Sequence, residues 1–145
     1  MALSDEDRAL IRSSFRLAAR NRREAAARFY EILFEQAPEA RALFVKDLEQ
    51  QGVELMNKLG LIVADLQNIQ GLVPVLEDLA LRHVAYGVKP EHYAPVGVAL
   101  VEMLAETVGE DFTPATRAAW TRAYAEVSEL MIRSAYTQER PLAIS

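Results

Sequence analysis

One histidine lies on the apolar face of a predicted helix, directly before the residues that end that helix. The stretch LALRHVAYGVKP, residues 79–90, contains His83, one of the 2 histidines among 145 residues. A buried imidazole loses its hydrogen bonds to water and needs a new partner for its ring nitrogens. Taken alone, His83 is therefore either a core histidine bonded to the backbone or a metal ligand.

An amide side chain lies on the helix that precedes this one. Gln51 shares an inward helical face with Leu55 and Leu59. Two facing helices would then present an imidazole on one side and an amide on the other. This pairing favours a ligand site over an ordinary core histidine.

Apolar residues recur at helical spacing along most of the chain, and no strand alternation is found. These stripes cover residues 10–18, 25–33, 48–69, 72–83, 98–108 and 120–131, with a short helical piece from Pro38 to about Phe44. The pattern predicts an all-α fold in one domain, residues 1–137. The last helix is expected to end near Tyr136, before a flexible tail over residues 138–145.

Capping and helix-breaking residues suggest where these helices begin and end. Ser4, Asn21 and Thr113 are placed as N-caps, and Pro114 follows at the first helical position. Gly71 and Pro74 are expected to separate two helices. Helix ends are expected at Gly87, Lys89 and Pro90, and at Gly109.

Composition excludes several classes of function. The chain has no cysteine, which excludes disulfides and thiolate metal sites. It begins with charged residues rather than a signal peptide, and no apolar run approaches the ~20 residues of a membrane span. The net charge of −5 and pI near 5.1 disfavour nucleic acid as the main partner. We therefore expect a cytoplasmic protein without a membrane or nucleic-acid partner.

Arginines are concentrated near the start of the chain. They recur at helical spacing and continue into the next segment: Arg8, Arg12, Arg16, Arg20, Arg22, Arg23 and Arg28. The favoured interpretation is a solvated face paired locally with Asp5, Glu6 and Glu24. A docking surface for an acidic partner is the alternative.

Several short motifs together resemble a known family in order and spacing. FYEILFEQAPEARALF (29–44), QGVELM (51–56), RHVAYGV (82–88) and HYAPVG (92–97) resemble the bacterial single-domain haemoglobins and the globin domain of flavohaemoglobins. DFTPATRAAW (111–120) looks equally like neuroglobin. The resemblance extends from Ser4 to about Tyr136. It implies a globin fold around one non-covalently bound haem b, since no CxxCH motif is present.

The resemblance assigns a proximal role to His83. Its Nε2 would bind the haem iron, while Nδ1–H is donated to a backbone carbonyl one turn earlier, that of Leu79. Phe44 matches the phenylalanine that packs on the porphyrin, although an ordinary core role would also bury it. Val88 and Tyr93 complete the expected haem contacts on this side.

Tyr30 and Gln51 match the distal pair of these bacterial globins. Their hydroxyl and amide would stabilise a ligand that gains negative charge on ferrous iron. The alternatives are a tyrosine with its hydroxyl at the surface and a solvated glutamine. Leu55 would form an apolar lid over the ligand, and Gly52 would allow two helices to cross closely.

Two departures from flavohaemoglobins affect the expected chemistry. Those proteins pair the tyrosine matched by Tyr93 with a glutamate of the last helix, and Ala135 stands in the glutamate's place. We therefore do not expect the proximal histidine to donate electron density strongly to the iron and its bound oxygen. The chain also stops near residue 145, so turnover would need electrons from an external flavin reductase.

The other histidine, His92, is expected to contact a haem propionate or solvent.

The expected function is tight, reversible O2 binding as a carrier, reservoir or sensor, with NO and CO as further ligands. The enzymatic alternative is NO dioxygenation with a separate reductase. A rival from another class is a haem-free globin fold that acts as an interaction or stress-sensing module. No phosphate-binding loop, HExxH pair or nucleophile elbow supports other chemistry.

Overall fold

The fold is built from α-helices joined by short 3-10 turns. In the computed structural model, the backbone is described for residues 3–44, 47–85 and 87–144, and side chains at 69, 70, 85 and 135–144 are outside that description. The α-helices are α1 (Asp5–Ala18), α2 (Arg22–Gln36), α3 (Leu48–Ala64), α4 (Ile69–Ala85), α5 (Tyr93–Val108) and α6 (Pro114–Ile144). No strand occurs in these described ranges, so the all-α prediction is confirmed.

Local capping explains where most of these helices begin. The Ser4 hydroxyl accepts from the Asp7 amide at 3.0 Å, and the Asn21 side chain accepts from the Glu24 amide at 3.2 Å. Thr113 Oγ1 accepts from the Thr116 amide in the same way, at 3.2 Å. Each bond satisfies one amide that the first helical turn leaves without a partner. The predicted caps at Ser4, Asn21 and Thr113 are therefore confirmed.

The break between α3 and α4 lies earlier than the sequence predicts. α3 ends at Ala64, a 3-10 turn spans Leu66–Asn68, and α4 begins at Ile69, with Gly71 and Pro74 inside it. The Asn68 carboxamide oxygen accepts from the Gly71 amide at 3.2 Å. A side-chain cap thus starts the helix before the two residues that we expected to separate it.

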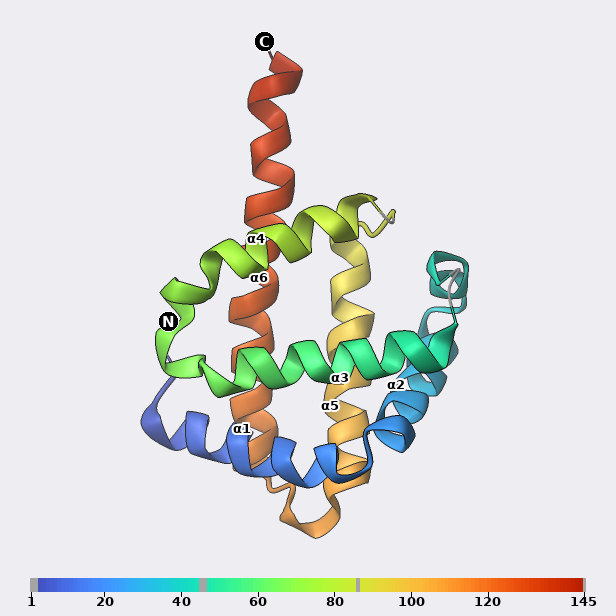
Figure 1. The fold of residues 1–145 in the computed structure, drawn as a ribbon, viewed down its shortest axis with the longest axis vertical. Coiled ribbons are helices and arrows are strands. Elements are labelled where there is room, and N and C mark those ends of the chain that lie inside the picture. Colours follow the sequence, from blue (N-terminus) through green and yellow to red (C-terminus); the bar gives the residue numbers. More distant parts are fainter. Residues whose placement is uncertain (1–2, 45–46, 86, 145) are drawn as a thin grey trace.

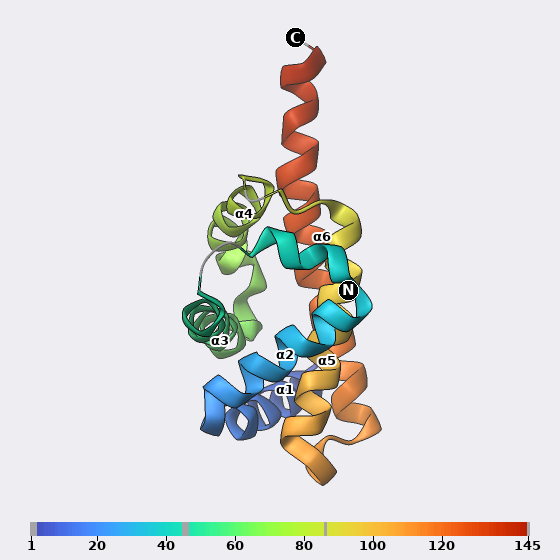
Figure 2. The same cartoon turned by 90° about the vertical axis from the view of Figure 1, so that its right-hand side faces the viewer.

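The last helix is longer than the sequence predicts. Its backbone continues to Ile144 rather than ending near Tyr136, and this end extends beyond the other helices (Figures 1 and 2). The side chains of residues 135–145 lie outside those described. The division into a domain of residues 1–137 and a tail of residues 138–145 therefore stays a prediction.

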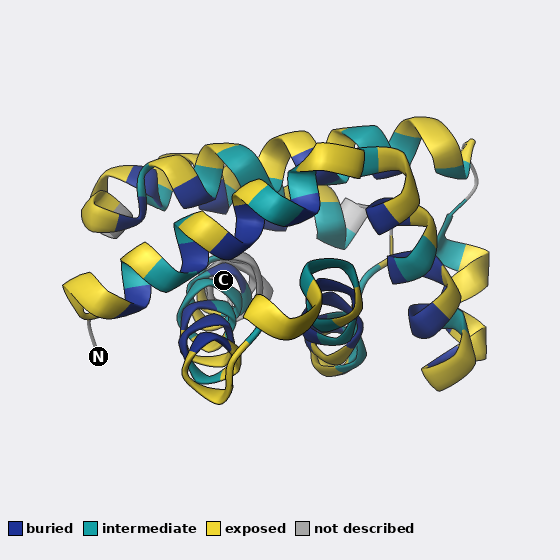
Figure 3. Cartoon of the chain, turned by 90° about the horizontal axis from the view of Figure 1, so that it is seen from below, coloured by how far each residue is buried: buried dark blue, intermediate teal, exposed yellow. Residues whose placement is uncertain are grey.

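Two long helices form the back of the molecule. Figures 1 and 2 show α5 and α6 side by side, with α3 and α4 on one side of this pair. α2 packs against both α5 and α3, while α6 packs against α1 and α4. In Figure 3 the buried residues lie on the inward faces of the helices and the exposed residues on their outward faces.

The buried apolar residues form two clusters. The larger one joins α1, α2, α3, α5 and α6, and includes Phe29, Tyr30 and Trp120. The smaller one contains Leu72, Leu76, Ala80, Tyr93 and Met131. Ile62 packs against both clusters. Two of the residues singled out in the sequence are thereby separated: Tyr30 belongs to the larger cluster, and the residues around His83 belong to the smaller one.

Among the helices in the described ranges, none is both long and apolar enough to cross a membrane.

Candidate haem site

His83 is held in one orientation by its own helix. Its Nδ1 lies 2.7 Å from the carbonyl oxygen of Leu79, one turn earlier on α4. A carbonyl only accepts, so Nδ1 carries the proton and donates it. The predicted bond to Leu79 is present, and it leaves Nε2 as the nitrogen with a free lone pair.

The charge state of His83 suits a metal ligand. The side chain is half-buried, and burial lowers the pKa of His83, against a smaller opposite effect of the bond to Leu79. Burial disfavours the charged imidazolium. The neutral ring, which is the form that binds metal ions, therefore prevails at pH 7.

Tyr93 packs beside His83 at the start of α5. The two rings are stacked, with their centroids 6.2 Å apart and their planes at 26°. Tyr93 is buried, while Val88 is half-buried and packs against the same cluster. The structure thus brings three of the predicted residues together on the α4–α5 side.

Tyr30 is the centre of an aromatic group on the opposite side. Its ring centroid lies 5.3 Å from that of Phe29, 5.9 Å from that of Phe34 and 5.3 Å from that of Phe44. The Tyr30 side chain is buried, and burial raises its pKa to about 12. The phenol therefore stays protonated at neutral pH and remains a hydrogen-bond donor.

A close crossing of α2 and α3 brings Gln51 to the same region as Tyr30. A Cβ atom at Gly52 would lie 2.6 Å from the Cβ of Ala26 and 3.5 Å from Cε2 of Tyr30. Only glycine allows this approach, which confirms the predicted role of Gly52. Gln51, the residue that precedes Gly52 on α3, therefore lies next to this crossing.

The amide oxygen of Gln51 has no hydrogen-bond partner in the described part of the chain. This Oε1 atom is buried. Such a group costs free energy unless something pairs with it. Leu55, one turn later on α3, is half-buried and packs against the larger apolar cluster.

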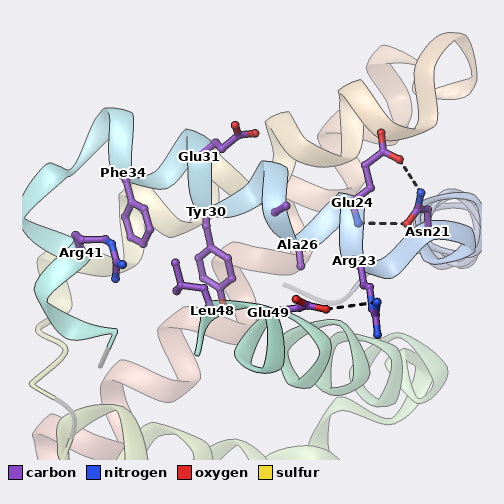
Figure 4. A pocket seen from close by; sticks show the side chains of 11 residues that line it. Asn21, Arg23, Glu24, Ala26, Tyr30, Glu31, Phe34, Arg41, Leu48 and Glu49 are labelled. Atoms are coloured by element: carbon purple, nitrogen blue, oxygen red, sulfur yellow. Dashed lines mark hydrogen bonds and ion pairs between the residues drawn. The ribbon is translucent and has the colours of Figure 1, made fainter. Parts of the chain in front are cut away.

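A hollow of about 660 Å³ opens beside Tyr30, between α2, the turn that follows it and the start of α3. Figure 4 shows Tyr30 reaching from α2 towards Leu48 and Glu49, with Phe34 beside it. Arg23 and Glu49 form an ion pair across the hollow, with 3.4 Å between their nearest nitrogen and oxygen. This space joins the surroundings of Tyr30 to the molecular surface.

The other histidine has a local role. The ring Nδ1 of His92 accepts a hydrogen bond from the Lys89 amide at 2.9 Å, within the 3-10 turn Pro90–His92. His92 is half-buried, and its bond stabilises the turn that leads into α5. The predicted contact with a haem propionate stays a prediction.

Sequence reasoning did not assign a role to Phe34 or Tyr124. Phe34 stacks on Tyr30 and makes an edge contact with Phe44, with centroids 5.6 Å apart. Its position one helical turn after Tyr30 was a usable signal. The Tyr124 hydroxyl donates to the Tyr93 carbonyl at 2.6 Å, a contact that no local spacing indicates. The side chain of Ala135 lies outside those described.

These residues fit a haem. α4 carries one oriented, neutral imidazole with a free nitrogen lone pair, α2 carries a protonated phenol, and α3 carries an amide whose buried oxygen has no partner in the described part of the chain. The apolar residues near each set belong to two different clusters, as expected for helices that pack on either side of a flat apolar group.

A family model for globins matches residues 27–131, which is well over half of the chain and includes Tyr30, Gln51 and His83. The chain belongs to the globin family. The globin fold expected from the resemblance is thereby confirmed, and haem is the group that this family binds.

Similar proteins place this globin near the flavohaemoglobins. It is 32% identical over 133 residues to a flavohemoprotein of Bordetella parapertussis, and 26% identical over 126 residues to one of Bacillus subtilis. These matches cover 90% and 85% of this globin, but only 33% and 32% of the relatives. The chain therefore spans about a third of the length of these curated relatives.

Solved structures share the fold over nearly the whole chain. An engineered carbene transferase from Rhodothermus marinus, provisionally described as a nitric oxide dioxygenase, has a TM-score of 0.86 and 28% identity, and the match covers 98% of this globin and 99% of that chain. A bacterial globin from Campylobacter jejuni has a TM-score of 0.82 and 22% identity, covering 94% and 99%. The latter likeness concerns the fold alone.

Proposed function

We propose that this globin binds haem b through His83 and uses Tyr30 and Gln51 to hold O2 tightly and reversibly. The observation that carries this proposal is the 2.7 Å bond from His83 Nδ1 to the Leu79 carbonyl, which leaves Nε2 free for iron. The apolar contacts with the porphyrin would come from four residues: Phe44, Leu55, Val88 and Tyr93. A cytoplasmic location and a role as carrier, reservoir or sensor belong to the same proposal.

When bound, haem supplies the iron position at which O2, NO or CO can bind. The chain's own residues then decide how such a ligand is held. His83 keeps its ring orientation because its second nitrogen is already bonded to α4. Tyr30 offers a protonated hydroxyl, and the Gln51 amide supplies a second donor beside its orphaned oxygen. Both donors favour a ligand that carries partial negative charge.

NO dioxygenation is a second candidate function. It is supported by the likeness to the Rhodothermus marinus protein, provisionally described as a nitric oxide dioxygenase, and to the flavohemoproteins. This function needs an electron donor, and we propose a separate flavin reductase for that role. NO consumption, measured with and without an added reductase, separates the two functions. Consumption that depends on the reductase supports the enzyme, and NO loss limited to one equivalent per haem supports the carrier.

The absorption spectrum of the purified protein tests haem binding itself. We expect an intense Soret band, which His83→Ala should weaken because the iron loses its protein ligand. Added imidazole should restore part of the spectrum. The matched control is His92→Ala, which removes the other histidine and should leave the ferrous spectrum unchanged.

Two outcomes would contradict the proposal. An unchanged haem content and ferrous spectrum in His83→Ala would exclude His83 as the proximal ligand. A folded wild-type protein that never takes up added haem would instead support the haem-free interaction or stress-sensing module.

A further inference from the structure

A second hollow lies at the other end of α3, where α1 packs against it. The groove has a volume of about 430 Å³ and is lined by four arginines, Arg12, Arg16, Arg20 and Arg22. None of the described residues that line it is acidic. A chain with a net charge of −5 thus carries a local concentration of positive charge on one face.

The arginines are positioned but not neutralised. Arg12 donates to the Gln67 amide oxygen at 2.6 Å, and Arg22 donates to that of Asn57 at 3.3 Å, so both bind uncharged partners. Arg16 and Arg20 are exposed and form no ion pair with the part of the chain that the structure describes. The expected pairing of this face with Asp5, Glu6 and Glu24 therefore does not extend to the groove.

The floor of the groove is apolar. Phe15 and Val63 are buried, Ala19 and Gly60 are half-buried, and Ala64 is exposed. The guanidinium carbon of Arg22 lies 6.0 Å from the centroid of the Phe15 ring, within the range of a cation–π contact. Positive charge thus surrounds a recessed apolar strip.

A partner surface that complements this groove would be acidic at its edges and apolar at its centre. Carboxylates pair with guanidinium groups through two parallel hydrogen bonds, and the strip can accept an apolar side chain between them. A membrane surface fits less well, because the large apolar side chains here, Phe15 and Val63, are buried in the fold and cannot insert between lipids. A nucleic acid would find no exposed aromatic side chain here on which its bases could stack.

We propose that this arginine groove is a docking site for an acidic segment of a partner protein, with an apolar side chain between its Asp or Glu residues. None of the residues that line the groove is among the predicted haem contacts, so the proposal stands independently of the haem chemistry. It gives the arginine-rich start of the chain a function, the one that the sequence alone left as the alternative.

The test uses the full haem-loaded chain and a short synthetic peptide in which Glu pairs flank a Leu. Calorimetric titration should detect binding that weakens as salt is raised, because exposed ion pairs are screened. The double variant Arg16→Glu/Arg20→Glu should weaken binding roughly tenfold or more, since two attractions become repulsions. The matched control Arg117→Glu/Arg133→Glu makes the same charge change on α6 and should alter binding by less than about twofold.

A second variant tests the apolar floor without changing charge. Ala64→Phe fills the groove from an exposed position and should weaken binding of the Leu-containing peptide several-fold. A peptide with Ser in place of Leu should bind more weakly to wild type and be insensitive to Ala64→Phe. Thermal melts of each variant check that the fold is retained.

Three results would overturn the proposal. One is an equal loss of affinity in the two charge-reversal variants, which would mean non-specific attraction. Another is binding of single-stranded oligothymidylate or phosphatidylserine vesicles as tight as that of the peptide, which would assign the face to a general polyanion. The third is the absence of peptide binding at low salt.

Discussion

The hydroxyl of Tyr124 donates a hydrogen bond to the backbone carbonyl of Tyr93 across 2.6 Å. The Tyr124 ring also packs so closely on α5 that a Cβ atom at Gly97 would lie 2.6 Å from its Cε2. Tyr93 in turn stacks on His83. α6 therefore fixes the start of α5, whose Tyr93 packs beside His83.

Tyr124→Phe should lower the stability of the fold. Burial raises the pKa of Tyr124, so its hydroxyl remains a donor well above neutral pH. Its loss should cost about 1 kcal/mol of unfolding free energy and lower the Tm by about 2–4 °C. A thermal melt of the haem-depleted protein measures this. The matched control is Tyr30→Phe, because the Tyr30 hydroxyl bonds to no residue in the described ranges. Equal Tm shifts in the two variants would show that the bond to Tyr93 contributes nothing.

Tyr30→Phe should instead affect ligand release. If its hydroxyl donates to O2, the variant loses a charge-assisted bond of roughly 1.5–3 kcal/mol, and O2 should dissociate about 10- to 150-fold faster. CO binding should change much less, because CO gains little negative charge on ferrous iron. Stopped-flow measurement of O2 dissociation tests this prediction. Equal rates in the wild type and the variant would show that Tyr30 does not hydrogen-bond to bound O2.

Gln51→Leu tests the second distal donor. A neutral amide is a poorer donor than a phenol, so O2 release should accelerate in the same direction but by a smaller factor. The two side chains form no bond to each other in the described structure, so the double variant with Tyr30→Phe should be non-additive only if a bound ligand brings them into contact. Simple additivity would mean that the two donors act separately, and a Gln51→Leu effect larger than that of Tyr30→Phe would reverse their assigned order.

What the sequence could predict depends on the range of the interactions involved. The caps at Ser4 and Asn21 follow from residue type and position alone, whereas the close helix crossing at Gly52 was expected from the resemblance to bacterial globins. The start of α4 was misjudged because the capping bond of Asn68 outweighs the helix-breaking tendency of Gly71 and Pro74. The Tyr124–Tyr93 bond joins residues far apart in the chain, so no helical periodicity could reveal it. The groove between α1 and α3 also joins distant parts of the chain, so the sequence indicated only the regular spacing of its arginines.

Two glycines of α3 should respond in opposite ways to the same substitution. Gly60→Ala places its Cβ 3.5 Å from the Phe15 ring, an ordinary contact, and should stabilise the helix by about 0.5–1 kcal/mol. Gly52→Ala places its Cβ 2.6 Å from that of Ala26 and must push α2 and α3 apart, so it should destabilise. Urea unfolding of both variants measures the difference. A stabilising Gly52→Ala would contradict the close crossing that positions Gln51 near Tyr30.

The acid sensitivity of the fold should depend on Asp7. This buried carboxylate accepts hydrogen bonds from Arg122 at 2.6 Å and 3.3 Å, and from the Ser4 amide at 3.2 Å. The bond with Arg122 is the largest cause that lowers the pKa of Asp7 below its usual value of 3.8. Protonation is therefore easier in the unfolded chain than in the folded one.

The sign of the pH effect follows from that difference. The contribution of Asp7 to stability is fully present above the unfolded pKa of about 4 and is lost as pH falls through the lower pKa of the folded state. Asp7→Asn should therefore reduce the unfolding free energy near neutral pH, and the gap from wild type should shrink as pH falls below about 4. Urea unfolding across this range measures the gap. The matched control Asp5→Asn removes a carboxylate that is 97% exposed and should change stability little. A gap for Asp7→Asn that stays constant down to low pH would mean that the ion pair with Arg122 does not stabilise the folded state, since only an ionised Asp7 can form it.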